Sequence, residues 1–178
     1  MGKIVKKTVE VVKKKEEAQY LTFRLGSEMF ATDILSIKEI IEYGNLTSVP
    51  MMPTFVRGVI NLRGAVVPVV DLSARFGRAS SEVTRRSCIV IVETINEGEE
   101  QDIGMVVDSV SEVLEIPKTE IEAAPSFGTK IRADFIIGMG NVNDKFVIIL
   151  DVNKVLSVDE MMMLSGEEIG SSDAVIVK

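Results

Sequence analysis

The sequence predicts a mainly β protein made of two similar small barrels, and two observations carry this prediction. The first is an internal duplication, because residues 55–72 align without a gap with residues 135–152. The second is a series of short apolar runs separated by turn residues, a pattern typical of small barrels. The identical positions in the aligned block are Phe55/Phe135, Gly58/Gly138, Asn61/Asn141, Val67/Val147 and Asp71/Asp151.

The duplication extends upstream of this block. Residues 36–42 align with residues 109–115 in the same order, so the similarity covers most of each half. We therefore expect two subdomains, at about residues 19–86 and about residues 87–152, with five strands in each.

The first strands follow from local patterns. Residues 20–25 alternate in polarity, Gly26-Ser27 supplies a turn, and residues 29–33 run back, which predicts a hairpin. Residues 34–41 are ambiguous, because Ile34, Ile37 and Ile41 also fit helical spacing. The segment is short for a helix, so we expect a single helical turn followed by a strand.

A second hairpin is predicted around Arg63-Gly64, which joins residues 59–62 to residues 65–71. Its counterpart in the second copy is Asn143-Asp144, and asparagine suits the positive φ of a tight hairpin turn. Pro68 has no N–H to donate, so it marks an edge or a bulge.

The two ends of the chain are expected to lie outside the barrels. Residues 1–18 are net basic and are predicted to be a disordered tail. After the second copy, the spacing of Ser157 and Glu160 is typical of a capping box and predicts a short helix at about residues 157–164. Residues 165–178 are small and acidic, which predicts a flexible tail.

Composition excludes several classes of protein. The apolar runs are far shorter than the roughly 20 residues that span a bilayer, so no membrane insertion is expected. A net charge of −7, two tyrosines and no tryptophan argue against nucleic-acid binding. Cys88 is the only cysteine, so no internal disulfide can form, and its apolar surroundings predict a buried, inert thiol.

The sequence also argues against catalysis. It contains no histidine, the commonest general base and metal ligand. The acidic residues lack the spacing of a calcium loop. Asp71 and Asp151 each close a strand at the same place in their own copy, which indicates a turn or capping role. We therefore expect no enzyme, no cofactor and no bound metal.

The run Gly58-Val-Ile-Asn-Leu-Arg-Gly64, followed by Val67-Pro-Val-Val-Asp-Leu72, resembles the CheW family of chemotaxis coupling proteins. Asp33-Ile-Leu, Glu39-Ile and Pro125-Ser-Phe127 extend the resemblance, which runs from about Gln19 to about Leu164. It implies two intertwined five-stranded SH3-like barrels with a hydrophobic core between them. It also implies a cytoplasmic adaptor, recruited to the inner face of the membrane, that couples the tips of methyl-accepting chemoreceptors to the regulatory domain of the histidine kinase CheA.

The same fold occurs as a domain of CheA and of CheV. No histidine is available for phosphotransfer, and residues 165–178 are too few for a receiver domain, so a free-standing coupler is expected. A protein of another class, a barrel pair that binds a small ligand, remains the alternative. It requires an enclosed pocket with convergent polar groups.

The resemblance implies a receptor-facing groove at Ile37, Glu39, Gly58, Asn61 and Arg63. Asn143 shows that this turn does not require arginine, so we expect Arg63 to bind a carboxylate and favour Glu39 as the partner. Gly58 has a structural alternative, a close backbone approach or a positive φ, and Asn61 has another, a hydrogen bond within the turn.

A contact with the kinase is implied on the first barrel. We assign it to the apolar residues of the proline-bounded loop, while ordinary packing of this loop is the alternative. The residues are Leu46, Val49 and Met51.

Deletion of residues 1–17 should leave binding to receptor-tip fragments and to the kinase unchanged, because the segment has no counterpart ahead of the second copy. The measurement is co-sedimentation together with backbone amide exchange. The competing interpretation is that the valines of this segment add a strand to a barrel edge. Slow exchange across residues 9–12, or a large loss of kinase binding, would contradict our prediction.

Overall fold

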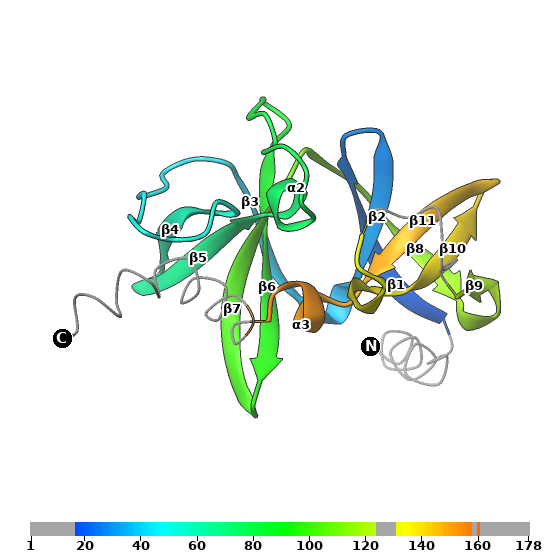
Figure 1. Cartoon of the computed structure of the whole chain (residues 1–178). Coiled ribbons are helices and arrows are strands. Elements are labelled where there is room, and N and C mark those ends of the chain that lie inside the picture. Colours follow the sequence, from blue (N-terminus) through cyan, green and yellow to red (C-terminus); the bar gives the residue numbers. More distant parts are fainter. Residues whose placement is uncertain (1–16, 124–130, 158–159, 161–178) are drawn as a thin grey trace, which may run out of the picture.

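The computed structural model describes residues 17–123, 131–157 and 160. The predictions for residues 1–16 and 165–178, for most of the helix at 157–164 and for Pro125-Ser-Phe127 fall outside this part. The described chain forms two curled β-sheets that lie side by side with short helices between them (Figure 1). Within the same part, no helix has the length and apolar character needed to cross a membrane.

The two sheets are the two SH3-like barrels. The first barrel is a five-stranded sheet of order β3-β6-β7-β5-β4, and the second barrel is a six-stranded sheet of order β8-β1-β2-β11-β10-β9. The strands are β1 (Glu17–Leu25), β2 (Glu28–Asp33), β3 (Ile37–Glu42), β4 (Val56–Leu62), β5 (Ala65–Asp71), β6 (Cys88–Asn96), β7 (Glu99–Val107), β8 (Ser109–Pro117), β9 (Ile121–Glu122), β10 (Ile136–Val142) and β11 (Lys145–Leu150). The helices are η1 (Ile34–Ser36), α2 (Leu72–Arg75), η2 (Lys118–Glu120), η3 (Ala133–Phe135) and α3 (Val152–Val155).

Each barrel takes its first hairpin from the other copy of the repeat. Strands β1 and β2 join the second barrel through a parallel pairing of β2 with β11, and β6 and β7 join the first through a parallel pairing of β7 with β5. The prediction of intertwined barrels is therefore confirmed. The stretches 19–86 and 87–152 are the sequence repeats, and each barrel is built from parts of both.

The start of β1 corrects one predicted boundary. Glu17 pairs with Pro117 and Ala18 with Ile116, so the last two residues assigned to the N-terminal tail belong to a strand. The second copy has one strand more than predicted, the two-residue β9 beside β10. The first copy has only an isolated bridge, Thr47 to Val59, at the corresponding place.

The predicted turns are confirmed. Residues 34–36 form one helical turn followed by β3, and the Asp33 carboxylate accepts a hydrogen bond from the Leu35 N–H. Arg63 and Asn143 both have positive φ, 51° and 52°, at the first position of their two-residue turns. Pro68 pairs with Val59 of β4 and lies before the residues of β5 that pair with β7.

The capping role predicted for the two repeated aspartates is also confirmed. The carboxylate of Asp71 accepts the Ala74 N–H at the start of α2, and that of Asp151 accepts two N–H groups at the start of α3. The capping box at Ser157 is half formed, because the Ser157 hydroxyl accepts the Glu160 N–H while the Glu160 side chain turns to other partners.

The main core lies between the two barrels and draws on both repeats. Four phenylalanine rings follow one another through it, in the order Phe23, Phe30, Phe76 and Phe135. The centroids of successive rings are 6.1, 5.6 and 6.1 Å apart. Cys88 was predicted to be buried, but it is only half-buried, at the start of β6. Burial and, next, the negative charge of Glu42 raise the pKa of its thiol, which lowers the fraction present as the reactive thiolate.

A guanidinium group occupies the point where the repeats meet. The Arg75 side chain is 4% exposed, and its Nε donates to the Val155 carbonyl oxygen at 2.7 Å. Its Cζ lies 5.1 Å from the Phe55 ring centroid and 4.9 Å from that of Phe135, so the first phenylalanine of each aligned block contacts the same cation.

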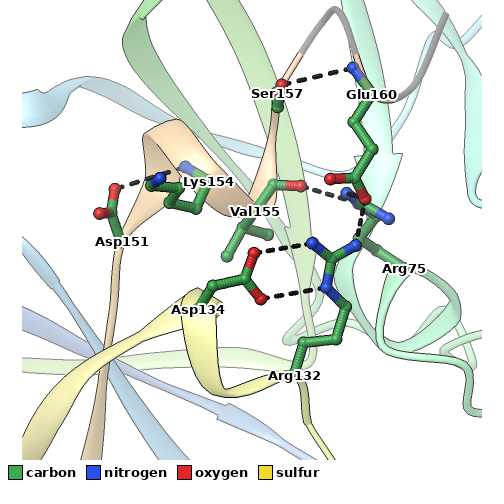
Figure 2. A network of polar contacts seen from close by, with 8 residues as sticks. All are labelled: Arg75, Arg132, Asp134, Asp151, Lys154, Val155, Ser157 and Glu160. Atoms are coloured by element: carbon green, nitrogen blue, oxygen red, sulfur yellow. Dashed lines mark hydrogen bonds and ion pairs between the residues drawn. The ribbon is translucent and has the colours of Figure 1, made fainter. Parts of the chain in front are cut away.

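Glu160 compensates this buried charge (Figure 2). Its Oε1 accepts from Arg75 Nη2 at 2.9 Å and from Arg132 Nη1. Arg132 also makes a two-pronged ion pair with Asp134, at 3.0 and 2.7 Å, and covers the Phe135 ring. Burial alone would raise the pKa of Glu160, but the hydrogen bonds from Arg132 and Arg75 outweigh it and lower that pKa.

Replacement of Glu160 by Gln should destabilise the fold by about 1–3 kcal/mol, because the buried Arg75 loses its anionic partner. The pKa of Glu160 is lowered in the folded state, so its contribution is present above the ordinary value of 4.5 and is lost as the pH falls below it. Urea unfolding at several pH values measures this difference.

The difference between parent and Glu160→Gln should therefore be large at pH 7 and small near pH 3. Glu115→Gln, on an exposed position of β8, is the control and should show no such dependence. An equal stability of parent and Glu160→Gln at pH 7 would show that Glu160 does not hold this network together.

Candidate functional site

The predicted groove residues lie around the gap between the two edge strands of the first barrel. Strands β3 and β4 are at opposite ends of the five-stranded order, and the curl of the sheet brings them together. The contact that joins them is an ion pair of 2.7 Å between Arg63 Nη2 and Glu39 Oε1. The predicted partnership of these two residues is confirmed.

Arg63 is unusual for its position. It occupies a left-handed conformation, which costs a residue with a Cβ roughly 1–2 kcal/mol relative to glycine. Its side chain is 75% exposed, whereas that of Glu39 is 27% exposed, so the pair contributes little to stability. The turn itself does not require an arginine, because Asn143 adopts nearly the same φ of 52° at the equivalent position.

Gly58 has the structural role given above as the alternative to a binding role, and it shows both a close backbone approach and a positive φ. Its φ is 151°, and a Cβ at this position would lie 2.4 Å from the Thr47 carbonyl oxygen. Two hydrogen bonds of 2.9 Å between Thr47 and Val59 lie beside it. They hold the loop that precedes β4 against this strand. Gly58 is buried and has no side chain, so its role in the structure is to let the loop approach β4 closely.

Asn61 and Ile37 stand at different depths. The Asn61 side chain is exposed, and its Oδ1 accepts the Gly64 N–H at 3.0 Å, which is the turn hydrogen bond considered above. Ile37 is half-buried at the start of β3 and packs against the core between the barrels. Of the five predicted residues, Glu39 and Arg63 are the pair joined by a contact in the described part of the structure.

One exposed apolar residue of this region was not predicted. Val66 is 69% exposed and pairs with Asn61 across the hairpin. The alternation along β5 could have predicted this exposure. Val67 and Val69 are buried, so Val66, one position before Val67, is expected on the opposite face of the strand.

The loop assigned to the kinase is partly exposed. Leu46 is half-buried and packs against the core of the first barrel, so ordinary packing explains it. Val49 and Met51 are 38% and 66% exposed. Met51 also has a positive φ of 61°.

A buried ion pair anchors this region and was not predicted. Asp71 is fully buried, and its Oδ2 accepts from Nε and Nη2 of Arg57 at 3.0 and 2.8 Å. Burial alone would lower the pKa of Arg57, but the hydrogen bond and charge of Asp71 outweigh it and raise that pKa. Arg57 Nη1 donates to the Tyr43 hydroxyl and Nη2 to the Ser81 carbonyl, so two loops are tied to β4.

These features suit a surface that binds another protein. The exposed groups offer one cation, a few apolar side chains and a rigid turn. No cluster of three or more metal-ligating side chains occurs among the residues that the structure describes.

The family model for the CheW-like domain matches residues 19–160. The chain belongs to the CheW-like domain family. The chemotaxis protein CheW of Klebsiella aerogenes is 33% identical over 146 residues, which cover 82% of this chain and 86% of that protein. The chemotaxis protein CheW of Thermotoga maritima is 31% identical over 144 residues, covering 79% and 89%.

A solved structure of this family agrees with the fold. The crystal structure of the scaffolding protein TtCheW from Thermoanaerobacter tengcongensis superposes with a TM-score of 0.71 and 34% sequence identity. The match covers 80% of this chain and 90% of that chain. The CheW-like resemblance inferred from the sequence is therefore confirmed.

Replacement of Gly58 by Val should lower thermal stability and detach the loop, because its side chain would collide with the Thr47 backbone. Calorimetry measures the melting temperature, and amide exchange at Thr47 and Val59 measures the loop. Ala65→Val, at an exposed site in the same hairpin, is the matched control. If Gly58→Val melts like the parent and keeps slow exchange at Val59, the close approach does not matter.

Proposed function

We propose that this chain is a chemotaxis adaptor that couples chemoreceptors to a histidine kinase without catalysis of its own. The observation that carries the proposal is the exposed Arg63, held by Glu39 across the gap between β3 and β4 in a strained turn. The chemotaxis and scaffolding roles named for its relatives support it. The absence of histidine from the sequence is consistent with a non-catalytic role.

The receptor side of the proposal rests on the groove. Receptor tips are helical hairpins, and a helix can lie along a shallow apolar groove edged by charges. Ile37 would supply apolar contact, and Arg63 would reach a carboxylate on the helix with its planar head. Asn61 offers its remaining hydrogen-bonding groups, while Gly58 holds the adjacent loop in place.

The kinase side rests on the loop that Thr47 and the Arg57 network hold against β4. Val49 and Met51 are its exposed apolar side chains, and Leu46 anchors it from below. A rigid loop loses little conformational entropy on binding, which favours its use as a contact surface. The regulatory domain of the kinase is the proposed partner, on the cytoplasmic side of receptor arrays.

The alternative, a barrel pair that binds a small ligand, receives no support from a specific observation. A cavity of about 600 Å³ opens to solvent along the second barrel. A ligand pocket is expected to enclose most of its ligand.

Arg63→Ala should weaken binding to receptor-tip fragments by about tenfold or more, since a charge-assisted contact contributes about 1.5–3 kcal/mol. Arg63→Lys should restore only part of the affinity, because an ammonium group lacks the fork of a guanidinium. Titration calorimetry with the full chain measures both.

Melting temperature should change little in these variants, because the Arg63 side chain is 75% exposed. Arg85→Ala removes an exposed arginine from another loop of the same barrel and serves as the control. An unchanged receptor affinity of Arg63→Ala would refute this assignment of Arg63.

A further inference from the structure

Two neighbouring methionines lie on an exposed stretch of the loop assigned to the kinase. The loop joins β3 to β4, and Figure 1 shows it on the side of the first barrel that faces away from the second. Residues 47–52 are all exposed. Met51 is 66% exposed and Met52 is 39% exposed. Molecules in solution can therefore reach both thioether groups.

Both ends of this exposed stretch are fixed to β4. Thr47 exchanges two backbone hydrogen bonds of 2.9 Å with Val59, and the Val56 N–H donates to the Pro53 carbonyl oxygen at 2.9 Å. Pro53 is itself buried. The methionines between these anchors are consequently accessible in the folded barrel, and a reagent needs no unfolding to reach them.

The other methionines of the described chain are less accessible. Met105 is 0% exposed and belongs to the main core. Met29 and Met139 are half-buried and pack against apolar clusters. Because oxidation of a side-chain sulfur depends on its exposure, Met51 and Met52 should react before these three.

We propose that Met51 and Met52 form an oxidation site that regulates the kinase contact, an inference that rests on the proposed function. The oxidant is a peroxide. A sulfur lone pair attacks one oxygen of hydrogen peroxide, the O–O bond breaks, and the products are a sulfoxide and water. The sulfur is oxidised by two electrons and the peroxide is reduced by two. Methionine sulfoxide reductases reverse the change, so the site can return to its apolar form.

Oxidation would change the chemistry of this surface without changing the fold. A thioether is apolar and adapts to an irregular partner surface, whereas a sulfoxide is polar. Burial of its oxygen against an apolar partner is unfavourable when no donor faces it. The oxidised loop should therefore bind the kinase more weakly. Both barrels should stay folded, because Met51 and Met52 lie outside the buried cores.

The test treats the full chain with hydrogen peroxide and follows the reaction by peptide mass spectrometry. The mass of one oxygen atom should appear at Met51 and at Met52 well before it appears at Met105. Titration calorimetry with the regulatory domain of CheA should then show binding that is weaker by about tenfold or more. Treatment with methionine sulfoxide reductase should restore the affinity, and the melting temperature should change little.

The double variant Met51→Leu/Met52→Leu separates this loop from all other methionines of the chain. Whatever its starting affinity, it should bind the kinase domain equally before and after peroxide treatment. Met29→Leu/Met139→Leu is the matched control and should lose affinity on treatment as the parent does.

Three results would overturn the inference alone: equal binding by the treated and untreated parent, the same loss in Met51→Leu/Met52→Leu, or oxidation of Met105 as fast as that of Met51. A different result would concern the proposed function. If the untreated parent does not bind the kinase domain, the kinase contact is refuted and its regulation with it.

Discussion

The parallel pairings of β2 with β11 and of β5 with β7 join strands of one repeat to strands of the other, and the remaining architecture depends on them. Neither sheet is complete without a hairpin from the opposite half of the chain. The core between the barrels is consequently shared, with Phe23 and Phe30 from the first repeat stacked toward Phe135 of the second. Such a core cannot be opened on one side alone, so the two barrels are expected to unfold together.

The duplication also shows where the two copies have diverged. Glu112 and Asn143 occupy the positions of Glu39 and Arg63, and Phe146 occupies that of Val66. In the second barrel these residues line an open cavity of about 600 Å³, whereas in the first the Arg63–Glu39 ion pair spans the gap. The backbone turn is nearly the same, with φ of 52° at Asn143 and 51° at Arg63, so the difference lies in side-chain chemistry.

Much of the fold could be predicted because its signals are local. The hairpin turns, the single turn before β3 and the caps at Asp71 and Asp151 each depend on residues within a few positions of one another. The Arg63–Glu39 pair could be predicted only because the second copy served as a comparison. The ion pair of Arg75 with Glu160 joins residues 85 positions apart, and the hydrogen bond of Arg75 with Val155 joins residues 80 positions apart. Contacts of this kind are fixed by tertiary packing, which no local pattern encodes.

Arg75 and Val155 end equivalent helices of the two repeats, and they touch through a hydrogen bond of 2.7 Å. If the two repeats were separate, identical chains related by a twofold axis, the residue at this position would face its own copy across that axis. Two arginines there would place like charges together in the core, and two valines would leave the Glu160 carboxylate without its buried partner. Fusion of the two copies into one chain removes this restriction, because a cation can then stand on one side of the axis and a carbonyl on the other.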